Sequence, residues 1–259
     1  LVPDLAESYQ ISDNGLIYTF TLRDDIFFHD DKRITSEDVT FTVNKAKDAR
    51  IKSPIASNWQ GVTVKALDER IVEFTLKTPY NPFLENATLG ILPEHIWKDA
   101  DLDQFTFSPN NFLPIGSGPY EVTSIQRRSD GSPEIYELSS FDNYGPGEKN
   151  ISNIYIHIYP DTTALLDGLR KGEIESTAAV SPQDAQTLKN EGYSIETSSM
   201  LRIFGVFFNQ NQATLFAKKD VRAALLQAVD KKAIIDKVLY KQQIIFAEKL
   251  GKTNEQKEK

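Results

Sequence analysis

An α/β fold is predicted by three features of the sequence. Between Tyr18 and Leu22, apolar and polar residues alternate, which is typical of a half-buried strand. From Ile151 onward, strand-like and helix-like segments alternate, and this rhythm is typical of βαβ units and a parallel sheet. The 259 residues are 40% hydrophobic and 25% charged, an ordinary globular composition that allows one large domain or two smaller ones.

In the first part of the chain, the strand that contains Tyr18–Leu22 leads through a connection over residues 24–32 into a helix. Thr35 or Ser36 is expected to cap this helix, because both residue types accept hydrogen bonds from free backbone N–H groups. Val39, Val43 and Ala46 recur at helical spacing and give the helix one buried face.

The next elements are predicted from alternation and from Pro, Gly and Asp punctuation. They are a hairpin of strands Val62–Ala66 and Ile71–Leu76, short helices at Phe83–Leu89 and Glu94–Lys98, and a second hairpin of strands Tyr120–Gln126 and Glu134–Ser140 that turns at Asp130-Gly131.

The second half predicts strands and helices in turn. They are strand Ile151–Tyr159, a helix from Asp161 to Gly172, strand Ile174–Ala179, a helix from Ser181-Pro182, strand Ile203–Phe208, helix Lys219–Val229, and a further helix to Tyr240. Residues 241–259 are strongly charged and predict a frayed tail.

Composition narrows the classes of partner. A net charge of −8 argues against nucleic acid and anionic membranes, which would repel the chain. The absence of cysteine excludes disulfides and thiolate chemistry, and no apolar run is long enough to span a membrane. The first residues read as part of a structured segment, so we expect the natural N-terminus to lie upstream.

The stretch "LRDDIFFHDDKR" concentrates aspartates around His29, which raises the question of a metal or acid–base site. Asp24, Asp25, Asp30 and Asp31 lack the spacing and the central Gly of a calcium-binding loop. The three histidines of the chain are isolated, so no zinc face is formed, and nucleophile elbows and phosphate loops are absent. We therefore expect no catalytic residue, no metal and no cofactor, and interpret the stretch as a turn that leads into a helix.

A binding function has better support. The run "RIFGVFFNQN", residues 202–211, places aromatic side chains and a charged group on a predicted strand, although a core strand would look the same.

Four segments, in this order, carry a family resemblance. They are "PDLAESYQISDNGLIYTFTLRDDIFFHDDKRITSEDVTFTVNKA", "IGSGPYEV", "DTTALLDGLRKGEIE" and "VFFNQN…VRAALLQAVDKKAII". Together they resemble the family 5 extracellular solute-binding proteins of ABC importers, which include oligopeptide-, dipeptide- and nickel-binding receptors. In this chain Asp31 stands where the family usually has Gly, so the turn is expected to differ, since Gly most readily adopts positive φ.

The resemblance implies a periplasmic-binding-protein-like type II fold, with mixed sheets and flanking helices in two lobes joined by a hinge. Residues 1–205 would form lobe I, with an inserted subdomain at about 40–150, and residues 206–240 would form the hinge and the first helices of lobe II. The family's opening strand region and most of its second lobe would be missing.

The same resemblance assigns roles to residues. As ligand-cleft positions it implies Ala179, Val180, Arg202, Ile203 and Phe204, with Trp59 as a further candidate. As scaffold positions of its motifs it implies Tyr18, Arg23, His29, Gly116, Gly118, Pro119 and Tyr120.

The function implied is capture of peptides by a non-enzymatic, monomeric binding protein outside the cytoplasmic membrane, in the periplasm or anchored at the cell surface as a lipoprotein. Its partners would be peptides and the permease subunits of an ABC transporter. Two alternatives stay open: the same fold binding a sugar oligomer or a metal chelate, and an unrelated hydrolase that uses two carboxylates.

Overall fold

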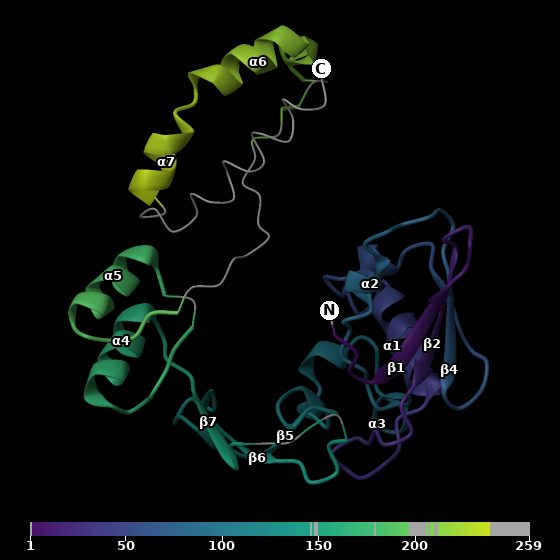
Figure 1. The fold of residues 1–259 in the computed structure, drawn as a ribbon. Coiled ribbons are helices and arrows are strands. Elements are labelled where there is room, and N and C mark those ends of the chain that lie inside the picture. Colours follow the sequence, from purple (N-terminus) through teal and green to yellow (C-terminus); the bar gives the residue numbers. More distant parts are fainter. Residues whose placement is uncertain are drawn as a thin grey trace. The chain divides into compact units, whose positions relative to one another are not determined.

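The computed structural model describes residues 2–145, 147, 150–178, 180–196, 206, 208–209 and 212–238 (Figure 1). The chain divides into two compact units, Leu1–Tyr159 and Pro160–Lys259, called unit 1 and unit 2 below. We describe each unit by itself.

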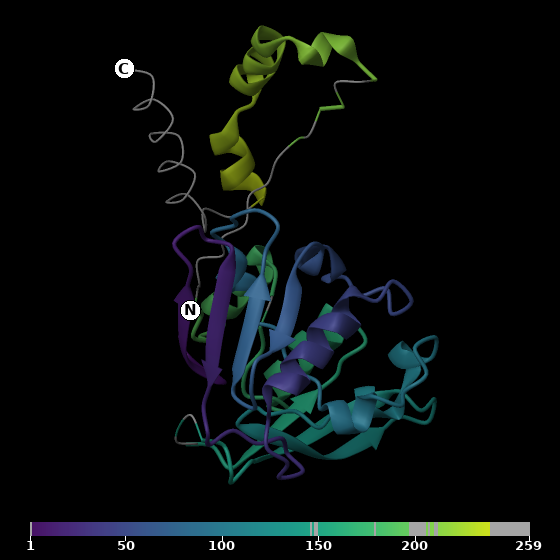
Figure 2. The ribbon, with the colours of Figure 1, turned by 90° about the vertical axis from the view of Figure 1, so that its right-hand side faces the viewer.

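A four-stranded antiparallel sheet forms the first layer of unit 1. Its strands lie in the order β1 (Ala6–Ile11), β2 (Ile17–Leu22), β4 (Ile71–Thr75) and β3 (Thr63–Ala66). The alternation in β2 turns Tyr18, Phe20 and Leu22 inward. Helix α1 (Ser36–Lys47) packs against the β3–β4 side of this sheet (Figure 2).

The core of unit 1 lies between this sheet, helix α1 and the segments that follow β4. Val39 and Val43 from α1 meet the inward side chains of β2 and β4. Aromatic rings fill the centre: Trp59 lies against Phe74 and Phe83, with ring centroids 5.9 Å apart in both pairs. Such tilted and edge-on aromatic contacts add to the free energy of burial.

The start of helix α1 is fixed by two buried polar residues. Thr35 is the N-cap residue, one of the two that the sequence predicts, and Asp38 completes a capping box by accepting hydrogen bonds from the backbone N–H and the hydroxyl of Thr35, both at 3.0 Å. Ser36 is fully buried, and its hydroxyl donates to the carbonyl of Asp68 in the β3–β4 turn. The helix start is thereby tied to the sheet.

The short elements after β4 and the second sheet complete unit 1. They are α2 (Phe83–Asn86), α3 (Glu94–Trp97), the 3-10 turns Ala56–Trp59, Phe105–Phe107 and Pro109–Asn111, and strands β5 (Tyr120–Arg127), β6 (Pro133–Ser140) and β7 (Asn153–His157). Strands β5, β6 and β7 pair antiparallel in that order. Gly131 has φ +84° in the β5–β6 turn, a left-handed conformation that suits glycine.

Unit 2 is helical in the residues that are described. Its elements are α4 (Thr162–Lys171), α5 (Pro182–Asn190), a 3-10 turn at Thr214–Ala217, α6 (Lys219–Ala228) and α7 (Lys231–Val238). Asp161 caps α4 by accepting from the Ala164 N–H, and Ser181 caps α5 in the same way. Leu166, Leu169 and Leu188 form a small core between α4 and α5.

The two hairpins and the longer helices agree with the sequence predictions, but the parallel sheet does not. Residues 174–178 form no strand, and every strand pairing in the described part of the chain is antiparallel. Ile174 packs instead against the α4–α5 core, so the burial that made this segment resemble a strand comes from helices. The predicted strand Ile203–Phe208 and the charged tail 241–259 fall almost entirely outside the described residues.

The sheet topology bears on the expected subdomain. Strands from residues 6–22 and 63–75 share one sheet, and residue 40 falls inside α1. A subdomain boundary near residue 40 would therefore divide a single sheet and its covering helix. The division into lobes itself remains a prediction.

Candidate functional site

His29 joins two of the sequence motifs that lie far apart in the chain. Its Nδ1 accepts from the Gly116 N–H at 3.2 Å, and its Nε2 lies 3.1 Å from the Gly118 carbonyl. The His29 backbone N–H donates to the Gly116 carbonyl at 2.9 Å, and the ring lies edge-on to Phe141 at 5.0 Å. The proton of the ring must therefore sit on Nε2, and the side chain clamps the turn that opens β5.

Glycine is suited to this contact at position 116. A Cβ there would lie 3.4 Å from Cε1 of the His29 ring, at the edge of ordinary van der Waals contact. The turn continues into Pro119, whose carbonyl accepts from the Phe141 N–H at 2.9 Å, and into Tyr120, which pairs with Ser140 at the start of the β5–β6 ladder.

The other motif residues lie in the framework around β2. Tyr18 is 3% exposed, its ring packs at a tilt against Phe83 with centroids 4.7 Å apart, and its hydroxyl points toward the Tyr80 carbonyl. Arg23 holds Asp25 through two hydrogen bonds of 2.8 and 3.0 Å. These bonds lower the pKa of Asp25 and raise the pKa of Arg23.

The aspartates of the first motif have separate partners rather than a shared one. Asp30 accepts from Nε2 of His95 at 2.7 Å, Asp31 accepts from Asn143 at 2.6 Å, and the Asp24 carbonyl accepts from Arg33. Among the described residues, no group of three His, Asp or Glu side chains is placed to hold a metal ion. The cluster is a hydrogen-bonded turn in this structure.

Asp31 adopts the left-handed conformation that glycine would favour, with φ +61°. Its N–H donates to the Phe28 carbonyl at 2.9 Å, so the turn closes although the residue is not glycine. Asp tolerates this conformation better than most residues other than glycine, and Asn143 holds its side chain.

Of the expected cleft residues, only Trp59 and Val180 lie in the described part of the chain. Trp59 is 1% exposed and belongs to the aromatic core of unit 1, so it offers no surface to a ligand and its assignment to the cleft is corrected. Val180 is half-buried against the small α4–α5 core of unit 2. Ala179, Arg202, Ile203 and Phe204 lie outside the described residues.

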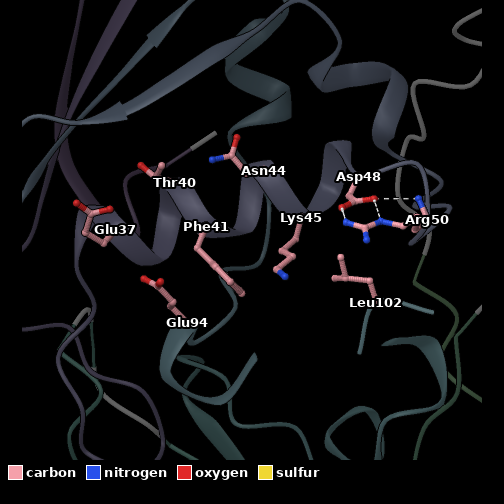
Figure 3. Close-up of a pocket in the computed structure, with 9 residues that line it drawn as sticks. All are labelled: Glu37, Thr40, Phe41, Asn44, Lys45, Asp48, Arg50, Glu94 and Leu102. Carbon is pink, nitrogen blue, oxygen red and sulfur yellow. Dashed lines mark hydrogen bonds and ion pairs between the residues drawn. The ribbon is translucent and has the colours of Figure 1, made fainter. Parts of the chain in front are cut away.

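A shallow pocket runs along the outer face of α1 (Figure 3). At its centre Lys45 lies 5.0 Å above the ring of Phe41, and at one end Asp48 and Arg50 form a two-bond ion pair. Glu37, Thr40, Asn44, Glu94 and Leu102 complete the lining. Asp48 and Arg50 of this lining already pair with each other.

Nothing in the sequence indicates that Asp38 also contacts helix α3. Besides capping α1, its second oxygen accepts from the Glu94 N–H at 2.9 Å, and so it holds the start of α3. Thr42 adds a second tie, because its hydroxyl donates to the Asp38 carbonyl and accepts from the Leu92 N–H. The sequence predicts a cap at Thr35 or Ser36, but only the fold could show that Asp38 also holds the start of α3.

The comparisons with known proteins agree with the sequence motifs. Residues 1–245 match the family described as "Bacterial extracellular solute-binding proteins, family 5 Middle". The oligopeptide-binding protein AppA of Bacillus subtilis is 30% identical over 243 residues, covering 91% of this chain and 43% of that protein. The dipeptide-binding protein of Escherichia coli is 28% identical over 261 residues, covering 92% and 47%.

Solved structures give the same fold with different ligands. NikZ from Campylobacter jejuni, in complex with Ni(L-His), has a TM-score of 0.69 at 27% identity, covering 92% of this chain and 47% of that one. AppA from Bacillus subtilis, in complex with a nonapeptide, has a TM-score of 0.63 at 25% identity, covering 90% and 46%. The chain thus spans less than half the length of these proteins, and its fold is part of the α/β periplasmic-binding-protein fold that the sequence predicts.

Proposed function

Because this chain belongs to the bacterial extracellular solute-binding proteins of family 5, we propose that it acts in the substrate-binding component of an ABC importer and captures peptides outside the cytoplasmic membrane. The family is one of solute-binding proteins and not of enzymes, in agreement with the lack of a catalytic constellation in the sequence. Its partners would be peptides and the permease subunits of the transporter.

One observation carries the choice of peptide as ligand: two sequence relatives that match over nine-tenths of this chain are named for peptides. They are the oligopeptide-binding protein AppA and the dipeptide-binding protein described above. Affinity for many peptides would come mainly from hydrogen bonds to an extended peptide backbone, with roomy pockets for the side chains.

In the described part of this chain, none of the helices has the length and apolar character to cross a bilayer. We propose that the protein is a monomer and that a lipid attaches it to the membrane.

A metal chelate is the second candidate ligand, and the nickel–histidine complex of NikZ favours it. A chelate brings its own metal ligands, so a receptor can recognise it by shape and hydrogen bonds with few metal-binding side chains of its own. A sugar oligomer has no such observation in its favour.

Calorimetric melts of this chain would test the proposal. The melt of the chain is recorded without ligand, with a pool of di- to pentapeptides, and with nickel–histidine. A ligand that binds only the folded state adds roughly 2.7 kcal/mol of stability at a hundredfold excess over its dissociation constant. A rise in Tm with peptides alone is the expected result; a rise with nickel–histidine alone would transfer the function to chelates.

The proposed cleft residues supply the matched variants. Arg202→Ala should abolish the peptide-induced rise in Tm, whereas Arg50→Ala should retain it, because Arg50 pairs with Asp48 just after the C-terminal end of α1. A rise retained in Arg202→Ala would contradict a contact of Arg202 with the ligand, and loss of the rise in both variants would contradict a role specific to Arg202.

A further inference from the structure

The turn between β1 and β2 contains the sequence Ser12-Asp13-Asn14-Gly15, and this is the only Asn-Gly pair in the 259 residues. Asn14 is exposed, and Gly15 has φ +67°. Asparagine is among the thermally labile residues of proteins, and a following glycine leaves its own backbone nitrogen unshielded by a side chain. The chemistry of this pair does not depend on the proposed function.

We propose that Asn14 is a site of spontaneous deamidation whose rate is set by opening of the β1–β2 turn. The backbone nitrogen of Gly15 attacks Cγ of Asn14, the side-chain amide nitrogen leaves as ammonia, and a five-membered succinimide forms. Water then opens the ring. Cleavage at Cγ gives aspartate with a normal backbone, and cleavage at the main-chain carbonyl gives isoaspartate.

Hydrogen bonds in the folded turn restrain both reacting groups. The nucleophile is held because the Gly15 N–H donates to the Ser12 carbonyl at 2.8 Å. The electrophile is held because Oδ1 of Asn14 accepts from the Ser12 hydroxyl at 2.7 Å and from the Leu16 N–H at 3.1 Å. The ring can close only when these bonds open together, so the reaction proceeds from a locally opened state.

Ser12 is the residue that closes the turn. Its hydroxyl also accepts from the Ile17 N–H at 2.9 Å, and its own N–H donates to the Ile17 carbonyl at 2.9 Å. Removing the hydroxyl should therefore remove one of the two hydrogen bonds to Oδ1 of Asn14 and, at the same time, loosen the Ser12–Ile17 contact that closes the turn.

The two products differ in what they do to this ladder. Aspartate keeps the acceptor oxygen that Ser12 and Leu16 bind and adds one negative charge. Isoaspartate inserts a further carbon into the main chain, so the Ser12–Ile17 pair loses its register. Strand β1 lies at the edge of its sheet within the described residues and pairs there with β2 alone, so hydrogen exchange at its end near Ile11 should increase.

The experiment follows the folded chain in mildly alkaline buffer, well below its Tm, by ion exchange, peptide mapping and enzymatic detection of isoaspartate. The acidic form should accumulate with its change at Asn14, and Asn14→Ser should remove it. Asn58 and Asn190, which are exposed but followed by Trp59 and Glu191, should stay intact. An unchanged Asn14, or equal conversion at Asn58 and Asn190, would contradict the assignment of Asn14 as the site of deamidation.

Two further variants test control by the turn. Ser12→Ala should convert several-fold faster than the wild-type chain. His29→Ala, which weakens unit 1 at a different turn, should convert at the wild-type rate. If Ser12→Ala is no faster, or if His29→Ala is accelerated as much, opening of the β1–β2 turn does not set the rate.

Discussion

The His29 side chain is the hydrogen-bond partner of two backbone groups in the turn that precedes β5. The loss of stability expected on removing it follows from these two bonds. His29→Ala leaves the Gly116 N–H and the Gly118 carbonyl without their side-chain partners. We expect the free energy of unfolding to fall by about 1–3 kcal/mol, the usual penalty for half-buried groups left without partners. Denaturant unfolding of the wild-type chain and of His29→Ala measures this loss.

A second histidine serves as the control for this prediction. Within the described residues His157 lies on a strand at the edge of its sheet, β7, and stacks on Tyr159 at 6.4 Å, so His157→Ala should cost less than about 1 kcal/mol. Nitrogen NMR should in addition find the His29 proton on Nε2. Equal losses in the two variants, or a proton on Nδ1, would contradict the clamp.

Asp48 provides a prediction about pH. The Arg50 side chain donates two hydrogen bonds to Asp48 and lowers the pKa of that carboxyl from 3.8 to about 2. Because the pKa is lower in the folded state, the linked stability is fully present above about pH 4 and is lost as the pH falls toward about 2. NMR titration of the carboxyl carbon checks the value.

Arg50→Ala should bring the pKa of Asp48 back toward its ordinary value, since the hydrogen bonds from Arg50 are the main cause of the shift. Arg33→Ala, which removes an arginine that donates to the Asp24 carbonyl, should leave the Asp48 titration in place. A titration unchanged in Arg50→Ala would show that another group lowers this pKa.

At the scale of elements, Asp38 holds two helices together. Asp38→Ala removes the cap of α1 and the acceptor for the first N–H of α3 in one step. We expect a loss of about 2–3 kcal/mol, because hydrogen bonds to a charged group are worth more than neutral ones. Chemical denaturation gives the loss, and hydrogen exchange should increase at the starts of both helices.

Glu37 is the matched control, since it is the exposed acidic neighbour in the same first turn. Glu37→Ala should change the free energy of unfolding by no more than about 0.5 kcal/mol. If the two variants are equally stable, the carboxylate of Asp38 does not join the helices.

The elements that sequence could predict are those with local signals. Asp161 and Ser181 cap α4 and α5 as the sequence predicts. Such a cap can be predicted because the side chain accepts from a backbone N–H only three residues further along the chain. The order of strands has no such signal: β4 pairs with its hairpin partner β3 and also with β2, which lies about fifty residues earlier in the chain.

The same limit explains the candidate site. Trp59 is a cleft candidate through the family resemblance alone. Aromatic residues line clefts and cores alike, and only its packing against Phe74 and Phe83 decides between them. The contact of His29 with Gly116 crosses 87 residues, so either motif alone gives no hint of the other.

At the scale of the molecule, unit 1 should fold without unit 2. It contains both sheets and an aromatic core of its own, whereas the described part of unit 2 buries mainly Leu166, Leu169, Ala185 and Leu188. A chain of residues 1–159 should therefore melt cooperatively in a circular-dichroism experiment, with dispersed NMR signals. A chain of residues 160–259 should show a broad, weak transition, and a sharp one there with none in residues 1–159 would contradict this division.

The burial of tryptophan in unit 1 has a consequence for spectroscopy. The chain has two tryptophans, and Trp59 and Trp97 are 1% and 4% exposed within this unit. Intrinsic emission excited at the indole band therefore reports on unit 1 alone, and a blue-shifted maximum that moves to the red marks loss of its core. A change in this emission on adding a solute would signal rearrangement around those indoles rather than stacking of the solute on them, and unit 2 would need a fluorophore of its own to be seen.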